Sequence, residues 1–175
     1  MITIRLLTEE DTQGMLDLHV RNRAFFKKFI PVRPEEYYTL EGQLTSLQNE
    51  RSAREAEQRY SFGIFLQDSG ELIGNVTLAE ILRGALQSCF IGYYLDEQQN
   101  GKGYMSEAVR MATEFGFQEL NLHRIEAGVM PHNIGSIRVL EKAGFVKEGI
   151  ARQNVLINGK WEDHQVLAII NENYK

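Results

Sequence analysis

Hydrophobic and polar residues alternate in three short stretches of the chain, a pattern typical of β-strands. The first stretch covers residues 2–6, and the next two cover residues 60–66 and 72–78. The turn sequence Asp68-Ser69-Gly70 lies between the second and third stretches. Two alternating runs joined by a short turn predict an antiparallel hairpin.

Two segments between the first and second of these strands have apolar residues at helical spacing. They cover residues 11–29 and residues 35–59. We expect a break between them, because Pro31 and Pro34 restrict the backbone and supply no N–H donor. Both helices therefore precede most of the sheet.

The middle of the chain returns to strands and then changes period again. Residues 78–81 and 89–95 predict a second strand pair, linked by a loop around Arg83-Gly84. Helical spacing follows over residues 108–115, and strand character returns at residues 124–129. This order predicts one strand-helix-strand unit beside the hairpins.

A short helix and a hairpin are predicted near the end of the chain. Residues 133–142 form the helix, and Gly144 signals its end because glycine adopts the left-handed conformation without steric cost. Asn158-Gly159, between residues 154–157 and 160–170, is the strongest hairpin signal that a short sequence offers. Hairpins combined with one strand-helix-strand unit predict a mixed α+β sheet.

Length and composition indicate one compact domain over residues 1–175, with 43% hydrophobic residues and no linker, low-complexity tract or repeat. No apolar run approaches the roughly 20 residues that cross a bilayer, and no signal peptide is recognisable, so we expect a cytoplasmic protein without membrane contact. The single cysteine, Cys89, agrees with a reducing compartment, and we expect it to be a buried strand residue.

The net charge of −5 argues against nucleic-acid binding, which usually requires clustered lysine and arginine. The same charge suits a basic partner. The four histidines, His19, His123, His132 and His164, show no metal-ligand spacing, and we interpret them as structural and predict no metal.

The candidate chemistry begins where the strand ending at Leu95 leads through a glycine-containing loop into the next helix. Gly101 and Gly103 would let a pyrophosphate approach the free N–H groups and the positive dipole end of that helix. Ser106 stands where a dinucleotide-binding motif needs its third glycine, and Gly103 stands where a Walker loop needs serine or threonine. From the glycines alone, a plain turn explains the loop as well as an anion site does.

Longer motifs resemble the GNAT acetyltransferase superfamily. Residues 91–95, Ile-Gly-Tyr-Tyr-Leu, followed by Gln98-x-x-Gly101-x-Gly103, look like its motif A. Downstream, Met130-Pro131-His132-Asn133, Ser136, Gly144-Phe145-x-x-Glu148-Gly149 and Asn158-Gly159-x-Trp161 resemble the branch of ribosomal-protein-alanine N-acetyltransferases. The resemblance is close over about the last 100 residues and holds only in outline over the first 60.

This resemblance implies a mostly antiparallel central sheet flanked by helices, and acetyl-coenzyme A (acetyl-CoA) as the acetyl donor. It implies that the loop binds the pyrophosphate and that the main chain at Leu95 positions the thioester. The implied cofactor-binding residues are Tyr94, Leu95, Gln98, Gly101, Lys102, Gly103, Tyr104, Met105 and Asn133.

Two residues at the start of the last helix are candidates for the chemistry. Asn133 has the position and type of a helix cap, a role compatible with cofactor contact. By resemblance, Ser136 lies near the coenzyme A sulfur and is our first catalytic candidate, as proton donor to the thiolate. Many superfamily members have a tyrosine where this chain has Leu140, so either Ser136 or water must serve. A departing thiolate whose thiol has a pKa of roughly 8.5 needs little help from an acid to leave.

Glu80 is the candidate base. It continues the alternation of Leu72, Gly74, Val76 and Leu78, which we expect to share one strand face. A partly buried carboxylate there would have a raised pKa and could accept an amine proton. A strand bulge would instead turn it into solvent. An α-amine with a pKa of roughly 7.7–8.0 needs no strong base.

The acceptor is the least determined feature, because it depends on the first two helices. We expect the acceptor to be the α-amine of a protein or peptide, with a basic ribosomal protein as the natural target. We expect the enzyme itself to be either a monomer or a homodimer. A small amine such as a polyamine, an amino acid or an aminoglycoside is the alternative, and Glu35, Glu36 and Glu41 suit any cation. A third interpretation is a non-catalytic coenzyme A-binding module, since a fold alone does not prove activity.

Overall fold

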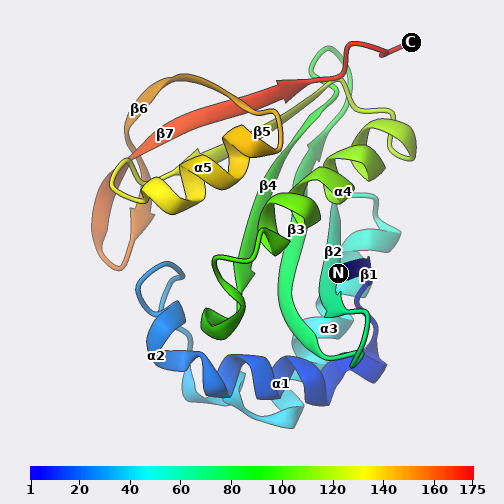
Figure 1. The fold of residues 1–175 in the computed structure, drawn as a ribbon, viewed down its shortest axis with the longest axis vertical. Helices are drawn as coiled ribbons and strands as arrows, with labels where there is room; N and C mark the ends of the chain where they lie inside the picture. Colours follow the sequence, from blue (N-terminus) through cyan, green and yellow to red (C-terminus); the bar gives the residue numbers. More distant parts are fainter.

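The computed structural model describes residues 1–175 and contains one seven-stranded sheet with helices packed against it (Figure 1). The strand order is β1-β2-β3-β4-β5-β7-β6, and every neighbouring pair is antiparallel except β4 and β5. The strands are β1 (Ile2–Leu6), β2 (Arg59–Leu66), β3 (Leu72–Leu82), β4 (Ser88–Leu95), β5 (Arg124–Val129), β6 (Val146–Ile157) and β7 (Lys160–Ile170). The predicted mixed, mostly antiparallel sheet is confirmed.

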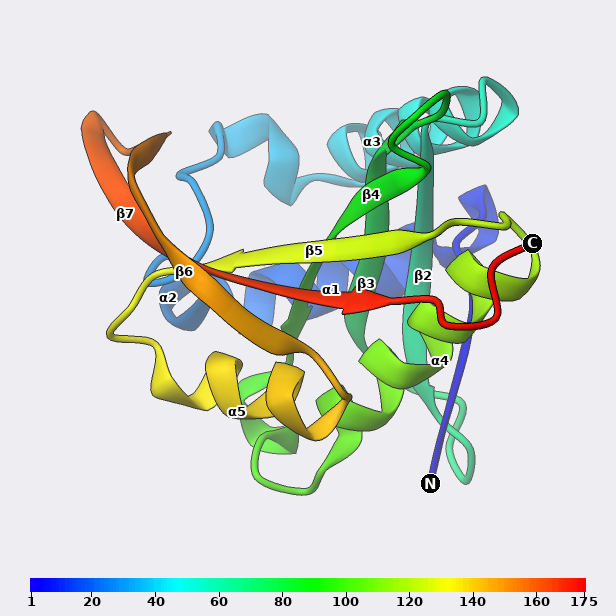
Figure 2. The ribbon, with the colours of Figure 1, turned by 90° about the horizontal axis from the view of Figure 1, so that it is seen from above.

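The helices are α1 (Thr12–Arg21), α2 (Arg23–Phe26), α3 (Leu40–Glu55), α4 (Tyr104–Gln118) and α5 (Ile134–Lys142), with 3-10 turns η1 (Glu9–Asp11), η2 (Glu35–Tyr38) and η3 (Glu97–Gln99). Figure 2 shows α4 and α5 on one side of the molecule and α3 on the opposite side. None of these helices has the length and apolar character needed to cross a membrane.

Both early helices are shorter than their periodicity predicts. The first ends at Asn22, whose backbone leaves the helical region at φ −105° and ψ 10° and whose side-chain amide donates to the Leu18 carbonyl. The second begins as the turn η2 and becomes α-helical only after Thr39, whose side chain accepts from the Gly42 N–H. Polar residues that compete for backbone hydrogen bonds therefore set boundaries that apolar spacing does not reveal.

The two faces of the sheet bury separate clusters. The larger cluster has 24 residues and includes Val109 of α4 and Leu140 of α5, whereas the smaller has seven and includes Leu18 of α1 and Leu47 of α3. The expectation that Leu72 shares a face with Val76 is wrong. A register shift between β2 and β3 places Ile73 in the larger cluster and Leu72 in the smaller one, because one extra residue inverts the alternation.

The predicted hairpin between β6 and β7 is confirmed at its turn. Asn158 and Gly159 both have positive φ, 49° and 83°, as a type I′ turn requires. The turn of the hairpin also lies beside the segment after α2 (Figure 1). The Val32 N–H of that segment donates to the Asn158 side-chain carbonyl at 3.3 Å.

The parallel pair β4 and β5 is the feature that positions the site. The two strands pair over only three positions, from Ser88 opposite Arg124 to Phe90 opposite Glu126. Each strand continues beyond that point, paired on its other side, β4 with β3 as far as Leu95 and β5 with β7 as far as Val129. The sheet is therefore divided between β4 and β5 for part of its length.

Candidate active site

A cavity of about 780 Å³ is lined by residues from both sides of this division. Its walls include Phe25 of α2 and the following segment, the first residue of β2, parts of β3 and β4, the loop after β4, the start of α4, and one side of α5. Because the lining runs from α2 to α5, two reactants can approach the same point from opposite faces of the sheet.

The loop after β4 presents the N-terminus of α4 to this cavity. Gly103 is the residue before the helix, with φ 81°, and no side chain caps the end, whereas Asn133 caps α5. Gly101 has φ 80°, and a Cβ added at either glycine would meet no atom within 4 Å. Glycine is thus required by the left-handed backbone rather than by lack of space. The uncapped first turn offers N–H groups and a positive dipole end to an anion, so it fits a pyrophosphate.

Most of the predicted cofactor residues line the cavity, namely Tyr94, Leu95, Gly101, Gly103, Tyr104, Met105 and Asn133. Gln98 and Lys102 do not line it. The Gln98 N–H donates to Asp96, and the Lys102 ammonium donates to the side chain of Gln99 at 3.0 Å. Gln99 lines the cavity instead, although the motif alone favoured Gln98.

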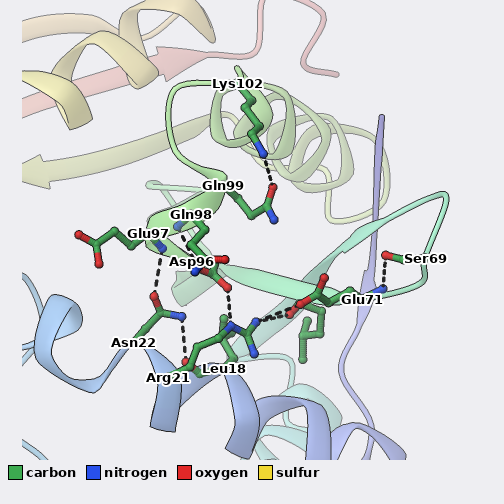
Figure 3. Close-up of polar contacts among 11 residues, drawn as sticks. Leu18, Arg21, Asn22, Ser69, Glu71, Asp96, Glu97, Gln98, Gln99 and Lys102 are labelled. Carbon is green, nitrogen blue, oxygen red and sulfur yellow. Dashed lines mark hydrogen bonds and ion pairs between the residues drawn. The ribbon is translucent and has the colours of Figure 1, made fainter.

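The start of the loop is anchored to α1 by contacts that the sequence did not reveal (Figure 3). Arg21 donates from Nε to the buried carboxylate of Asp96 at 2.6 Å, and the other carboxylate oxygen accepts the Gln98 N–H. Asn22 accepts the Glu97 N–H at 3.0 Å. Arg21 and Asp96 are 75 positions apart, so no local pattern connects them.

Ser136 lies where β4 faces the start of α5. Its hydroxyl is 2.6 Å from the Tyr93 hydroxyl, and its N–H donates to Asn133, which confirms the predicted cap. Burial raises the pKa of Tyr93 to about 12, so this side chain is a neutral phenol at physiological pH. Leu140 is fully buried and offers no hydroxyl. Tyr93 and Ser136 both line the cavity, so β4 supplies a phenol that α5 lacks.

The alternation along β3 predicts that Glu80 points inward, but the structure shows that it does not. The pairing of β3 with β4 is interrupted between Ala79 and Leu82, and Glu80 has a positive φ of 53° within that bulge. The residue is exposed and does not line the cavity, whereas Ala79 does. The bulge has inverted the alternation at this point, so the structure gives Glu80 no access to a reacting amine.

A buried histidine, His19, lies behind Tyr94, which lines the cavity. His19 Nε2 lies 3.0 Å from the Tyr94 hydroxyl and 3.2 Å from the Tyr37 hydroxyl. Burial, with a smaller effect from the charge of Arg33, lowers the pKa of His19 to about 4. The imidazole is therefore neutral at pH 7, with Nε2 within hydrogen-bond distance of both tyrosine hydroxyls.

The chain belongs to the GNAT acetyltransferase family, since the model of the acetyltransferase (GNAT) domain matches residues 1–146. It is accordingly an acetyl-CoA-dependent N-acetyltransferase. A probable N-acetyltransferase, YjcK of Bacillus subtilis (strain 168), is 56% identical over 170 residues, which cover 97% of this chain and 94% of that protein.

Two solved structures show the same fold. The ribosomal-protein-S5-alanine acetyltransferase from Vibrio fischeri superimposes with a TM-score of 0.93 at 33% identity, covering 99% of this chain and 95% of that one. Mycobacterium smegmatis RimJ, solved in complex with CoA-disulfide, superimposes with a TM-score of 0.91 at 26% identity, covering 98% and 82% of the two chains.

Proposed function

We propose that this enzyme acetylates the N-terminal α-amine of a protein or peptide, with a ribosomal protein as the first candidate. The observation that carries the proposal is the likeness to the S5-alanine acetyltransferase of Vibrio fischeri, which extends over 99% of the chain at a TM-score of 0.93. It includes α2 and the segment after it, which form the acceptor side of the cavity.

The donor side follows from the loop and β4. Acetyl-CoA supplies the acetyl group as a reactive thioester. The uncapped first turn of α4 binds the pyrophosphate, and Gly101 and Gly103 keep side chains out of the way. Beyond Phe90, the edge of β4 that faces β5 is unpaired, so its backbone groups up to Leu95 can orient an extended, amide-containing arm.

Transfer proceeds by direct attack of the amine rather than through an acetylated cysteine. The only cysteine, Cys89, is 1% exposed and does not line the cavity. Burial raises its pKa to about 12, which suppresses the nucleophilic thiolate. An N-terminal amine has a pKa of roughly 7.7–8.0, so part of it is neutral at pH 7.5 without a protein base.

Proton delivery to the departing thiolate is assigned to the Ser136 hydroxyl, with Tyr93 behind it. The 2.6 Å separation of the two hydroxyl oxygens allows Tyr93 to donate to the serine oxygen as the serine proton passes to the thiolate, and the proton released by the attacking amine restores the neutral phenol through solvent. The Tyr93 hydroxyl also lies 3.2 Å from the Ser136 carbonyl, which accepts the phenol proton when the serine hydroxyl is the donor between the two hydroxyl groups, so the same phenol holds the start of α5 in place.

The proposal is tested by incubating the enzyme with acetyl-CoA and a panel of amines, followed by mass spectrometry. The panel contains ribosomal proteins, their N-terminal peptides, spermidine, free amino acids and an aminoglycoside. We expect acetylation of peptides, located at residue 1 by tandem mass spectrometry. Acetylation of a small amine but no peptide would contradict the proposal, and coenzyme A binding without turnover would indicate a non-catalytic module.

A further inference from the structure

Every charged residue that lines the cavity is a cation. The four are Arg33, Arg59, Arg138 and Lys142, and no aspartate or glutamate is among the 28 lining residues. The chain as a whole has 24 acidic and 19 basic residues, so its composition would favour the opposite sign. The positive wall is therefore a local property of this cavity.

Only half of these cations can be explained by the phosphates of the donor. Arg138 and Lys142 belong to α5, on the side of the cavity that contains the pyrophosphate loop. Arg33 follows α2, and Arg59 begins β2 in a row with Ala79 and then Phe90 across the sheet. These two arginines lie at the acceptor side, where a donor phosphate has no place.

The guanidinium groups of both acceptor-side arginines keep hydrogen-bond donors available. Arg59 donates only from Nε, to both carboxylate oxygens of Glu50 at 3.0 and 2.9 Å. Its two terminal nitrogens have no protein partner, and Glu50 does not line the cavity. Arg33 makes no hydrogen bond, and its guanidinium carbon is 5.0 Å from the ring centre of Tyr37.

The segment that carries Arg33 is restrained rather than free. Pro31 and Pro34 flank it and fix the local backbone, and the Val32 N–H bonds to Asn158 of the β6–β7 turn. The cation–π contact with the Tyr37 ring restrains the guanidinium. Arg33 is thereby held at the cavity although its side chain is exposed.

The glutamates that suited a cationic acceptor are not part of this wall. Glu35, Glu36 and Glu41 are exposed, and none of them lines the cavity. Glu35 forms an ion pair with Arg23 instead. His19, behind the wall, is uncharged at pH 7. None of these three glutamates therefore places a negative charge on the cavity wall.

We propose that the acceptor carries a carboxylate close to its reactive amine, bound by Arg33 and Arg59. This inference rests on the proposed function, in which case the substrate is an N-terminus with aspartate or glutamate among its first residues. The N-terminal residue itself lies among the aromatic side chains Phe25, Phe29 and Phe90, and the following acidic side chain meets the two guanidinium groups.

The test compares peptides that begin with alanine and carry aspartate at position 2, 3 or 4 with matched peptides carrying asparagine or lysine there. We expect kcat/KM for the best aspartate peptide to exceed that of its asparagine match by about fivefold, the gain that a partly exposed ion pair gives. The ratio should shrink as salt is added. Equal kcat/KM for aspartate and asparagine at all three positions would overturn the inference.

Two variants assign the preference to residues. Arg33→Gln and Arg59→Gln should each bring the aspartate-to-asparagine ratio toward one, in kcat/KM and in peptide affinity measured calorimetrically with coenzyme A present. Arg110→Gln is the matched control, because Arg110 is exposed on α4 and does not line the cavity. A ratio that survives both substitutions would also overturn the inference. Arg33 makes no hydrogen bond, so Arg33→Gln leaves no buried group without its partner. This variant therefore remains informative if Arg59→Gln fails to fold.

Free amino acids separate this inference from the proposed function. Acetylation of free alanine in preference to alaninamide, which lacks the carboxylate, with no peptide acetylated, would support the carboxylate requirement and contradict the peptide acceptor. Acetylation of spermidine alone would overturn both. Acetylation of all peptides without regard to charge would leave the peptide acceptor standing and reject the carboxylate.

Discussion

Two hydroxyl groups 2.6 Å apart, those of Tyr93 and Ser136, carry the proposed proton delivery at the scale of single residues. We expect Ser136→Ala to lower kcat by less than about 100-fold, the low end of what a general acid contributes, because a thiolate is a good leaving group. Tyr93→Phe should have an effect of similar size.

Both variants should be measured as kcat against pH together with the dissociation constant of coenzyme A. Unchanged coenzyme A affinity would show that the loss concerns proton transfer rather than binding. A loss of kcat above about 100-fold in Ser136→Ala would contradict the view that little acid assistance is needed.

The left-handed glycines of the pyrophosphate loop allow a second residue-level prediction. Gly103→Val should cost about 1–2 kcal/mol of stability, because a side chain strains a left-handed backbone. It should also weaken coenzyme A binding by about tenfold or more, a loss of about 1.4 kcal/mol. Calorimetric titration with coenzyme A and thermal unfolding measure the two effects.

Gly84→Val is the matched control for this substitution. Gly84 has a φ of 64° and equally open surroundings, but it does not line the cavity. It should lose similar stability and keep its coenzyme A affinity. If Gly103→Val binds coenzyme A as tightly as Gly84→Val does, the assignment of the loop is wrong.

Local chemistry explains which site residues could be predicted from the sequence. Gly103 and Asn133 were identifiable because a left-handed turn and a helix cap each depend on one residue and its near neighbours. The predicted position of Glu80 was wrong because a bulge turns its side chain to the other face of β3. The alternation of apolar residues along the strand does not reveal that bulge. The Tyr93 partner of Ser136 was missed because 43 residues separate the pair.

At the scale of elements, α1 and the loop after β4 behave as one unit through the ion pair of Arg21 and Asp96. We expect Asp96→Ala to cost about 2 kcal/mol in the free energy of unfolding, because it leaves a charged donor and a backbone N–H without their acceptor. Coenzyme A affinity should fall with it, since the loop loses its attachment. Urea unfolding and coenzyme A titration test both effects.

Glu71→Ala is the control for this pair. Glu71 is half exposed and lies 3.6 Å from the same arginine. Its removal should cost less than about 1 kcal/mol, as for other surface ion pairs, and should leave coenzyme A binding unchanged. Equal costs for the two substitutions would show that the loop does not depend on Asp96.

The order of the strands and helices was predictable, whereas their boundaries were not. The alternating pattern of a strand and the 3.6-residue period of a helix both mark the side chains that are buried. In this fold those side chains are buried between the sheet and the helices that cover it. The ends of α1 and α3 depend instead on Asn22 and Thr39, which form single hydrogen bonds with the backbone. The division between β4 and β5 depends on tertiary packing and leaves no periodic signal.

At the scale of the whole molecule, His19 gives stability a dependence on pH. Its pKa is about 4 in the folded protein, against 6.5 for the ordinary side chain. Between these values the unfolded chain binds a proton that the folded chain does not, so the free energy of unfolding falls as pH falls. Below pH 4 this group adds no further loss.

His19→Gln removes the titration and isolates it from other groups. On lowering the pH from 7 to 5, the wild type should lose about 2 kcal/mol more of its unfolding free energy than the variant loses. Urea unfolding at the two pH values measures the difference. Parallel losses in the two proteins would contradict the low pKa of the buried imidazole.

Charge acts in two opposite ways at this scale. The net charge of −5 attracts a basic partner from a distance, while the cations of the cavity wall select what enters it. Under the proposed function, the two effects together suit a substrate with a basic body and an acidic N-terminal segment. Salt should weaken both, because exposed charges are screened within about 10 Å.

The short pairing of β4 with β5 makes the sheet two panels joined by a narrow hinge. Three residue pairs connect the panel β1 to β4 with the panel β5 to β7, so the free protein has few backbone hydrogen bonds that resist their separation. A donor bound along the free edge of β4 restrains the separation of the two panels. Amide hydrogen exchange at Ile91, Tyr93 and Leu95, whose N–H groups alternate with those that bond to β3, should therefore slow when coenzyme A is added, and the enzyme becomes more rigid when it is ready to react.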